Sequence, residues 1–317
     1  MLNTNSNTRT IGTFEGEIPG PRIIAISAIH GNEPAGVRAL EMVFKALKQE
    51  RSSNPAFQFR GKLLGMIGNL QAFQLNQRFL EQDLNRMWAT NKLDEINAST
   101  SGDLTAENRE VQDIFDYISI ECQSSTTEPT VFIDLHTTSA EGGVFSIPTD
   151  EADSLVLAKH LGAPAIIGLQ GTIPGTLLGF AATGGFSTQS PATLPICIAF
   201  EAGQHESPHA ISLTAHAIVQ CLRTMGNIEQ NGLAEFSESL HLPLPAYVPP
   251  VVRFIYAHHI AAEDKFKMRP GYVNFQPVQQ GEHLADDRYG PVLSPDKGLI
   301  LMPLYQARGS DGFFIVQ

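Results

Sequence analysis

A strand, a short turn and a helix between residues 23 and 48 constrain the fold more than any other part of the sequence. Residues 23–29 form an unbroken apolar run rich in β-branched side chains, which is typical of a buried strand in a parallel sheet. Residues 34–48 begin with proline, which suits a first helical turn, and carry apolar side chains at helical spacing. The sequence therefore predicts a β-turn-α unit with His30 and Glu33 in the turn.

The residue types in this turn are suited to zinc. In an open α/β sheet, sites are built at the carboxyl ends of the strands. A catalytic zinc ion takes nitrogen and oxygen ligands from three protein side chains and keeps one position for water. His30 and Glu33 would supply two of these ligands, so a third ligand and a base are expected elsewhere in the chain.

Composition limits the classes of protein that fit. The 317 residues are 42% hydrophobic and 17% charged, as in a globular protein of roughly two domains. The formal net charge of -12 argues against nucleic acid or an anionic membrane as the main partner. No apolar run approaches the ~20 residues that span a bilayer, and residues 1–10 lack the apolar core of a signal peptide.

The three cysteines are widely spaced along the chain. This spacing favours free thiols in a reducing compartment over a disulfide framework, and the cytoplasm is the default location. The cysteines are Cys122, Cys197 and Cys221.

Further strands and helices alternate along the first two thirds of the chain, which predicts an α/β fold with a mixed, mostly parallel central sheet and helices on both faces. Residues 1–20 suit a lead-in with an edge strand, and the glycine-rich residues 168–189 suit a long loop with short strand pieces, a type of loop that often covers a site. The predicted strands are 61–69, 130–135, 165–168 and 195–200, and the predicted helices are 105–119, 155–160 and 208–225.

The composition changes after residue 235. Residues 242–250 contain four prolines, which fits a linker or a domain entry. Short β-like runs separated by glycine, proline and aspartate follow at 251–257, 271–275, 298–303 and 312–316. We expect one domain at 1–235 and a small β-rich domain at 236–317 that shapes access to the site.

Three predicted strands end in residues that can do chemistry. His30 and Glu33 follow the first strand, His136 follows 130–135, and Glu201 follows 195–200. A single histidine or glutamate at a strand end is more often structural, but parallel strands bring three such ends to one rim. Asp134 lies on the same strand face as His136, and it suits either a carboxylate that orients a ligand imidazole or a partner of local backbone.

Together, four short motifs resemble the succinylglutamate desuccinylase/aspartoacylase family, a branch of the zinc carboxypeptidase superfamily. They are His30-Gly31-Asn32-Glu33, Asp83-Leu84-Asn85-Arg86, Asp134-Leu135-His136-Thr137-Thr138 and Phe200-Glu201-Ala202-Gly203, and the resemblance covers about residues 25–205. The resemblance implies a zinc carboxypeptidase-like fold and one zinc ion. It also implies that the β-rich tail is the family's second domain.

The resemblance also assigns roles to individual residues. His30, Glu33 and His136 match the zinc ligands, and Glu201 matches the carboxylate that activates the zinc-bound water. A glutamate in that place can take a proton and return it to the departing amine. Arg78 matches the arginine that polarises the scissile carbonyl, and Asn85 with Arg86 matches the pair that holds the substrate's α-carboxylate. Taken alone, either arginine would suit a surface ion pair with Glu81 or Asp83.

The sequence departs from the family pattern at several points. Thr137 follows the second histidine where aspartoacylases have asparagine, and residues 190–193 lack the arginine expected about ten residues before the base. These departures argue against N-acetylaspartate as the substrate. Tyr305 is the nearest match to a tyrosine of the family's C-terminal domain, and His205 is a candidate for the pocket border. Lys297 lies in a Pro-Asp-Lys-Gly turn that suits either a solvated turn or the hairpin tip of a biotinyl or lipoyl carrier.

The sequence therefore predicts zinc-dependent hydrolysis of the amide bond in a small N-acylated amino acid or related carboxylate. Two alternatives remain at this stage, a metallocarboxypeptidase that acts on peptides and a metal-dependent binding protein without activity. The expected partner is a small molecule with a carboxylate, with neither nucleic acid nor membrane involved, and a homo-oligomer remains open.

Overall fold

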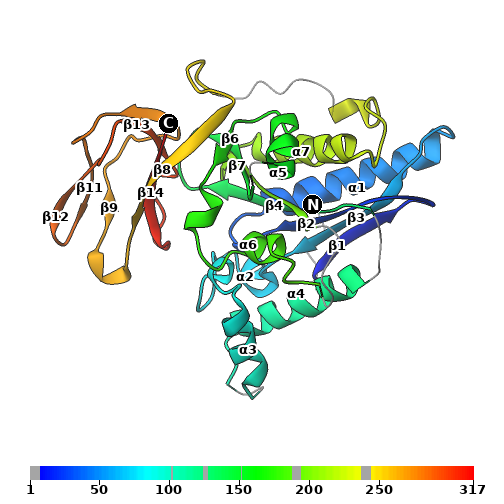
Figure 1. Cartoon of the computed structure of the whole chain (residues 1–317), viewed down its shortest axis with the longest axis horizontal. Helices are drawn as coiled ribbons and strands as arrows, with labels where there is room; N and C mark the ends of the chain where they lie inside the picture. Colours follow the sequence, from blue (N-terminus) through cyan, green and yellow to red (C-terminus); the bar gives the residue numbers. More distant parts are fainter. Residues whose placement is uncertain (1–7, 101–102, 124–127, 151, 188–193, 237–243) are drawn as a thin grey trace.

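The fold is described from a computed structural model of the whole chain (Figure 1). The structure describes residues 8–100, 103–123, 128–150, 152–187, 194–236 and 244–317. Residues 190–193, where the sequence lacks the expected arginine, lie outside the described residues. Residues 242–243, at the start of the expected linker, also lie outside them.

An eleven-stranded sheet with the order β1-β3-β2-β4-β7-β5-β6-β8-β14-β13-β10 forms the centre of the molecule. The four neighbours β3, β2, β4 and β7 are parallel, whereas β1 runs antiparallel at the edge, as expected for the lead-in. The mixed, mostly parallel central sheet is therefore confirmed. The strands of this part are β1 (Thr10–Glu15), β2 (Ile18–Ser27), β3 (Arg60–Ile67), β4 (Thr130–Thr138), β5 (Val144–Pro148), β6 (Ala165–Ile167) and β7 (Ile196–Gln204).

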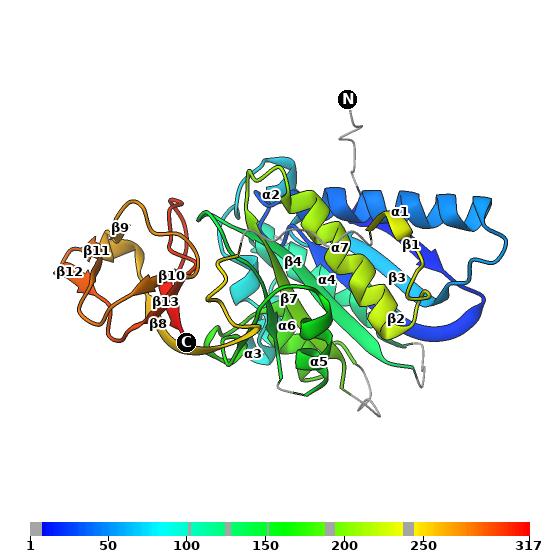
Figure 2. The same ribbon diagram turned by 90° about the horizontal axis from the view of Figure 1, so that it is seen from above.

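Helices cover both faces of this sheet because its parallel strands are apolar on both sides. Ile23 and Ala25 on β2 point into one core with α1, α5 and α7, and Ile24 and Ile26 point into the other with α3, α4 and α6. Figure 2 shows α1 and α7 lying over the strands. The helices are α1 (Ala35–Ser53), α2 (Leu70–Gln74), α3 (Thr90–Ala98), α4 (Ala106–Gln123), α5 (Asp153–His160), α6 (Leu177–Ala182) and α7 (Ala210–Met225), with 3-10 turns η1 (Leu84–Arg86), η2 (Gln170–Thr172), η3 (Ala234–Phe236) and η4 (Ala262–Asp264).

The C-terminal region is rich in β-structure, as expected, and gathers at one end of the molecule (Figure 1). Strand β8 joins the C-terminal region to the rest of the central sheet, because it pairs with β6 through residues 251–253 and with β14 through residues 254–259. The division at residue 235 stays a prediction. The strands are β8 (Val251–His259), β9 (Lys267–Met268), β10 (Gln276–Val278), β11 (His283–Asp287), β12 (Gly290–Leu293), β13 (Gly298–Leu301) and β14 (Asp311–Val316), of which β12, β11 and β9 form a separate sheet.

Two local expectations are wrong. Residues 168–187 form η2 and α6 and contain no strand after β6, because Thr176 caps a short helix by accepting from the Gly179 amide and the buried Leu177 and Leu178 face the core. Residues 271–275 form a turn, and β10 begins at Gln276.

Within the described residues, no helix combines the length and the apolar character that crossing a membrane requires. The three cysteines are free thiols, as expected.

Candidate metal and active site

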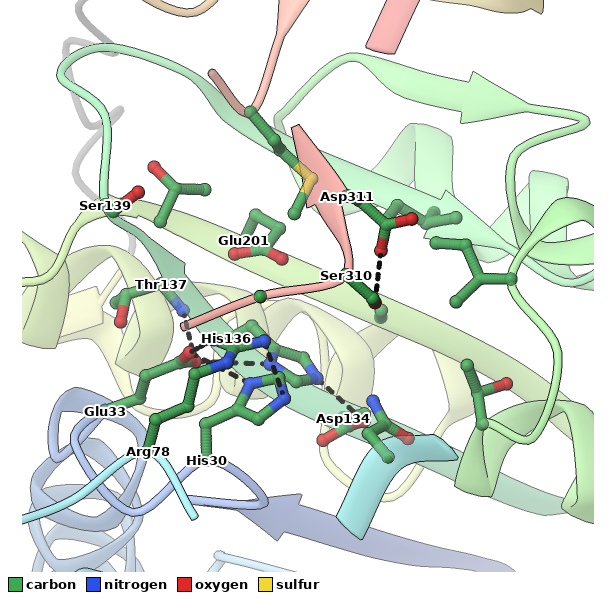
Figure 3. Close-up of a pocket in the computed structure, with 18 of the residues that line it drawn as sticks. His30, Glu33, Arg78, Asp134, His136, Thr137, Ser139, Glu201, Ser310 and Asp311 are labelled. Carbon is green, nitrogen blue, oxygen red and sulfur yellow. Dashed lines mark hydrogen bonds and ion pairs between the residues drawn. The ribbon is translucent and has the colours of Figure 1, made fainter. Parts of the chain in front are cut away.

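The strand ends converge as the sequence predicts. His136 on β4 is the register partner of Glu201 on β7, so two parallel strands place an imidazole and a carboxylate side by side. Because side chains alternate along a strand, Asp134 and His136 point to the same face. Figure 3 shows Glu201 close to the group formed by His30, Glu33 and His136.

The turn after β2 is shaped by backbone requirements. Ala28 adopts a left-handed conformation with φ of 49°, which is uncommon for a residue with a Cβ atom and redirects the chain at the end of the strand. Gly31 lies against α2 so closely that a Cβ atom would come within 2.2 Å of the Ala72 backbone. The turn closes when the Glu33 amide donates to the His30 carbonyl at 3.1 Å. These constraints bring His30 and Glu33 to the same side.

Glu33 is the centre of a buried group of three potential metal ligands. Its Oε1 lies 3.0 Å from His30 Nδ1, and its Oε2 lies 3.2 Å from His136 Nδ1. One ligand atom from each residue lies within 4.8 Å of the others. The Thr137 amide also donates to Glu33 Oε2 at 3.0 Å, which fixes the carboxylate between the two rings.

Each imidazole has a second carboxylate on its far side. His30 Nε2 lies 3.2 Å from Asp83 Oδ1, and His136 Nε2 lies 2.8 Å from Asp134 Oδ2. A carboxylate at one ring nitrogen holds the proton there and leaves the other nitrogen as a metal donor. The contact with His136 favours the first of the two alternatives for Asp134, a carboxylate that orients an imidazole, and sequence reasoning did not foresee the contact of Asp83 with His30.

The pKa values show that this site favours positive charge. Burial alone would lower the pKa of His136, but Asp134 and Glu33 hold it well above its ordinary value. Burial would raise the pKa of Glu33, but His30 and His136 hold it well below. A cation bound among these carboxylates would replace the protons, so the donor set His30, Glu33 and His136 fits zinc.

Glu201 lies beside the cluster of His30, Glu33 and His136 but makes no comparable hydrogen bond among the described residues. Its side chain is buried, and its Oε2 has no hydrogen-bond partner among the described residues. Burial, opposed by His136 and reinforced by Glu33, raises its pKa to about 7. A buried carboxylate without a partner and with a pKa close to neutrality suits a group that exchanges a proton with a ligand.

Arg78 reaches the same cluster. Its guanidinium lies 3.5 Å from Glu33 Oε1, 3.0 Å from His30 Nε2 and 3.4 Å from Asp83 Oδ2. The side chain is only 14% exposed, so the alternative of a surface ion pair fails on location even though Asp83 is a partner. Arg78 thus lines the pocket beside the candidate ligands.

Asn85 and Arg86 also line the pocket. Asn85 Oδ1 accepts from the Leu177 amide at 2.9 Å, so this side chain also fastens the loop before α6. Arg86 Nη1 donates to the Asn85 carbonyl at 2.9 Å, and its Nη2 donates to Asp311 at 2.7 Å. Arg86 therefore makes its ion pair with Asp311 at the start of strand β14, and not with Glu81 as the alternative from the sequence suggested.

Glu107 holds the loop that carries Arg78, Asn85 and Arg86. Its carboxylate accepts from the backbone amides of residues 80, 81 and 82 at 2.7, 3.0 and 3.2 Å, and from Asn69 Nδ2 at 3.1 Å. The side chain is fully buried. Sequence reasoning missed Glu107, because an acid in the first turn of a helix looks like an ordinary favourable charge.

The C-terminal region supplies one wall of the pocket. Residues 302–314 contribute Met302, Leu304, Gln306, Gly309, Ser310, Asp311 and Phe314 to the lining, and the loop before α6 contributes Gln170, Ile173 and Thr176. The pocket encloses about 880 Å³, counting space open to solvent. Two distant parts of the chain therefore cover the cluster.

Three further candidates from the sequence are not among the described residues that line the pocket. His205 borders the site through Thr137, whose Oγ1 lies 2.7 Å from its Nδ1. Tyr305 donates its hydroxyl to the Arg269 carbonyl within the C-terminal region and is absent from the described pocket lining. Lys297 is exposed in the turn between β12 and β13.

Comparison with known proteins agrees with these motifs. Residues 19–230, more than half of the chain, match the model of the succinylglutamate desuccinylase/aspartoacylase catalytic domain. A probable aspartoacylase from Nostoc sp. is 30% identical over 125 residues, covering 39% of this chain and 37% of the relative. A succinylglutamate desuccinylase from Photorhabdus laumondii is 33% identical over 119 residues, covering 37% of this chain and 34% of the relative. The matches thus span little more than a third of these relatives' length.

A solved structure extends the comparison to the whole fold. The crystal structure of a succinylglutamate desuccinylase/aspartoacylase from Rhodobacter sphaeroides has a TM-score of 0.63 at 15% identity, covering 96% of this chain and 88% of that one. At this identity the likeness concerns the fold, and it includes the β-rich C-terminal region.

Proposed function

Because the chain belongs to the succinylglutamate desuccinylase/aspartoacylase family, we propose that it is a zinc-dependent deacylase that hydrolyses the amide bond of a small N-acylated amino acid or related carboxylate. The observation that carries the proposal is the buried group of His30, Glu33 and His136, with Glu201 beside it in register on the next strand. The family supports an amide-cleaving deacylase, and the donor set supports zinc.

His30, Glu33 and His136 would hold the ion. When bound, zinc lowers the pKa of a water molecule towards ~7 and polarises a carbonyl group. The carboxylate of Asp134 keeps the proton on the outer ring nitrogen of His136, so this imidazole presents its Nδ1 atom to the centre, whereas the outer ring nitrogen of His30 lies between Asp83 and the Arg78 guanidinium.

Glu201 moves the proton. Its ionised carboxylate accepts a proton from the attacking water, and Oε2 is free for that contact among the described residues. The same group then gives the proton to the departing amine, which must leave as a neutral species. Burial keeps the protonated form accessible near neutral pH, so Glu201 can serve in both steps.

The arginines serve charge and orientation. Arg78 lies beside the candidate ligands, where it can donate to the carbonyl oxygen as negative charge develops on it. Arg86 and the Nδ2 amide of Asn85 line the same pocket and can orient a substrate carboxylate.

The two other functions suggested by the sequence fit less well. A peptide carboxypeptidase needs an open groove for a chain, whereas residues 302–314 and the loop before α6 both wall this pocket. A metal-dependent binding protein has no need of a buried carboxylate without a partner at the metal centre, yet Glu201 occupies that place.

The test is a panel of N-acyl amino acids offered to zinc-loaded and chelated protein, with release of the free amine as readout. We expect hydrolysis only with metal, and a loss of kcat on the order of 10²–10⁴ in Glu201→Gln with zinc still bound. Glu206→Gln, an exposed glutamate five residues further on, is the matched control and should keep full activity. Release of C-terminal residues from peptides would favour the carboxypeptidase, and ligand binding without turnover would favour the binding protein.

A further inference from the structure

The family resemblance assigns the guanidinium of Arg86 to the substrate carboxylate, but this guanidinium already makes an ion pair with a carboxylate of the protein itself. Arg86 Nη2 donates to Asp311 Oδ2 at 2.7 Å, although the two residues are 225 positions apart in the chain. Both line the pocket, and their side chains are only 25% and 13% exposed. Figure 3 shows Asp311 with Ser310 in the pocket that also contains Glu201.

Asp311 is fixed in the pocket wall on more than one side. It is the first residue of β14 and pairs in register with His259 on β8. Its Oδ1 lies 2.7 Å from His259 Nδ1, and its Oδ2 also accepts from the Ser310 hydroxyl at 3.2 Å. Its negative charge is therefore a built feature of the pocket rather than that of a loose surface side chain.

Among its described lining residues, the pocket has no arginine or lysine beyond those that already face carboxylates. Among the described lining residues, Arg78 and Arg86 are the only arginines, and there is no lysine. Arg78 faces Glu33 at 3.5 Å and Asp83 at 3.4 Å, and Arg86 faces Asp311. The sequence contains no lysine or arginine between Lys159 and Arg223, the stretch that supplies the loop before α6 and the strand of Glu201.

We propose that Asp311 is a specificity-determining residue that restricts the pocket to N-acyl amino acids whose side chain carries no negative charge. This inference rests on the proposed function and specifies its substrate class. A guanidinium has five N–H donors, and the contacts of Arg86 with Asn85 and Asp311 use two of them. The remaining donors can take one substrate carboxylate, whereas a second carboxylate would meet Asp311 without a cation of its own.

Two substrates of nearly equal shape isolate this effect, because N-acetylglutamine and N-acetylglutamate differ mainly in one charge. We expect zinc-loaded protein to prefer N-acetylglutamine in kcat/KM by on the order of tenfold or more, since like charges brought together select against a ligand. Asp311→Asn keeps the shape and an oxygen acceptor for Arg86 while it removes the charge. This variant should raise kcat/KM for N-acetylglutamate relative to N-acetylglutamine by on the order of tenfold.

Asp286→Asn is the matched control. Asp286 belongs to β11 in the same C-terminal region, its side chain is 55% exposed, and it does not line the pocket. The control removes the same charge from the molecule and should leave the substrate ratio unchanged. A purely structural role of Asp311 would lower kcat/KM for both substrates equally, and thermal unfolding of each variant would detect it.

Binding measurements keep the inference testable apart from turnover. In zinc-loaded Glu201→Gln protein, calorimetry should show tighter binding of N-acetylglutamine than of N-acetylglutamate, and adding Asp311→Asn should narrow that difference. Equal or better use of N-acetylglutamate by the unaltered protein, or a ratio that Asp311→Asn does not move, would overturn the inference while hydrolysis still supported the deacylase. Failure of the proposed function would appear differently, as an absence of turnover on every acylated amino acid while the two affinities still differed.

Discussion

His136 on β4 and Glu201 on β7 are register partners on neighbouring parallel strands. The sheet itself therefore sets the spacing between a candidate metal ligand and the candidate base, and no loop has to fold to bring them together. Their environments differ, because His136 lies between two carboxylates whereas Glu201 Oε2 has no partner among the described residues. A proton or a cation is thus favoured on one side of the pair, and a free acceptor remains on the other.

Removing the metal should destabilise the protein. A ligand present at about a thousand times its Kd stabilises the folded state by ~4 kcal/mol, so chelation should lower Tm by roughly 5–15 °C. His136→Ala should show the low Tm with or without zinc. His160→Ala, which removes an exposed histidine of α5, should retain the zinc-dependent shift. Differential scanning calorimetry with metal analysis measures both, and an equal Tm for zinc-loaded and chelated protein would contradict the assignment of the ligands.

Zinc binding should release protons, and Glu201 should contribute one of them. Burial raises the pKa of Glu201 to about 7, so the metal-free protein holds that proton at pH 6 and has largely lost it at pH 8. The positive charge of zinc favours the carboxylate form, so binding at pH 6 expels the proton. Calorimetry in buffers of different ionisation enthalpy should find about one proton fewer released by Glu201→Gln at pH 6. The difference should vanish at pH 8, and identical proton release at pH 6 would refute this account.

Arg78 should act on the chemical step. Arg78→Ala removes a donor beside the candidate ligands and should lower kcat on the order of 10²–10³. Arg78→Lys should recover only part of the rate, because a point charge cannot reproduce the contacts with both Glu33 and Asp83. Steady-state kinetics measures both variants. Arg38→Ala, an exposed arginine of α1, is the control, and a change in KM alone would instead assign Arg78 to uniform binding.

The convergence of the candidate ligands and the candidate base could be predicted from sequence for a physical reason. His30 follows an apolar parallel strand, whereas His136 and Glu201 lie within the last residues of two others, and such strand ends meet at one rim. Each residue type then matched a chemical need of zinc or of proton transfer. The same argument correctly placed Asp134, because residues two apart on a strand share a face.

The rest of the site depends on contacts that leave no local signal. Asp311 meets Arg86 only because β14 returns from the C-terminal region to wall the pocket. Sequence reasoning missed helix α6 because glycines surround it, although its cap and its buried leucines stabilise the helix. Asp83 stood inside a recognised motif, but its contact with His30 requires the fold of the whole loop.

Glu107 should be as important for this loop as any residue in the pocket. Glu107→Ala would leave three backbone amides and Asn69 Nδ2 without their acceptor inside the protein, at a cost of about 3 kcal/mol or more. Glu107→Gln keeps one oxygen and should cost less. Because Arg78, Asn85 and Arg86 flank the held amides, both variants should also lower kcat/KM. Urea unfolding and kinetics test this against Asp113→Asn, an acid on the same helix with a side chain 69% exposed. Loss of stability with unchanged kcat/KM would show that the loop keeps its catalytic shape without Glu107.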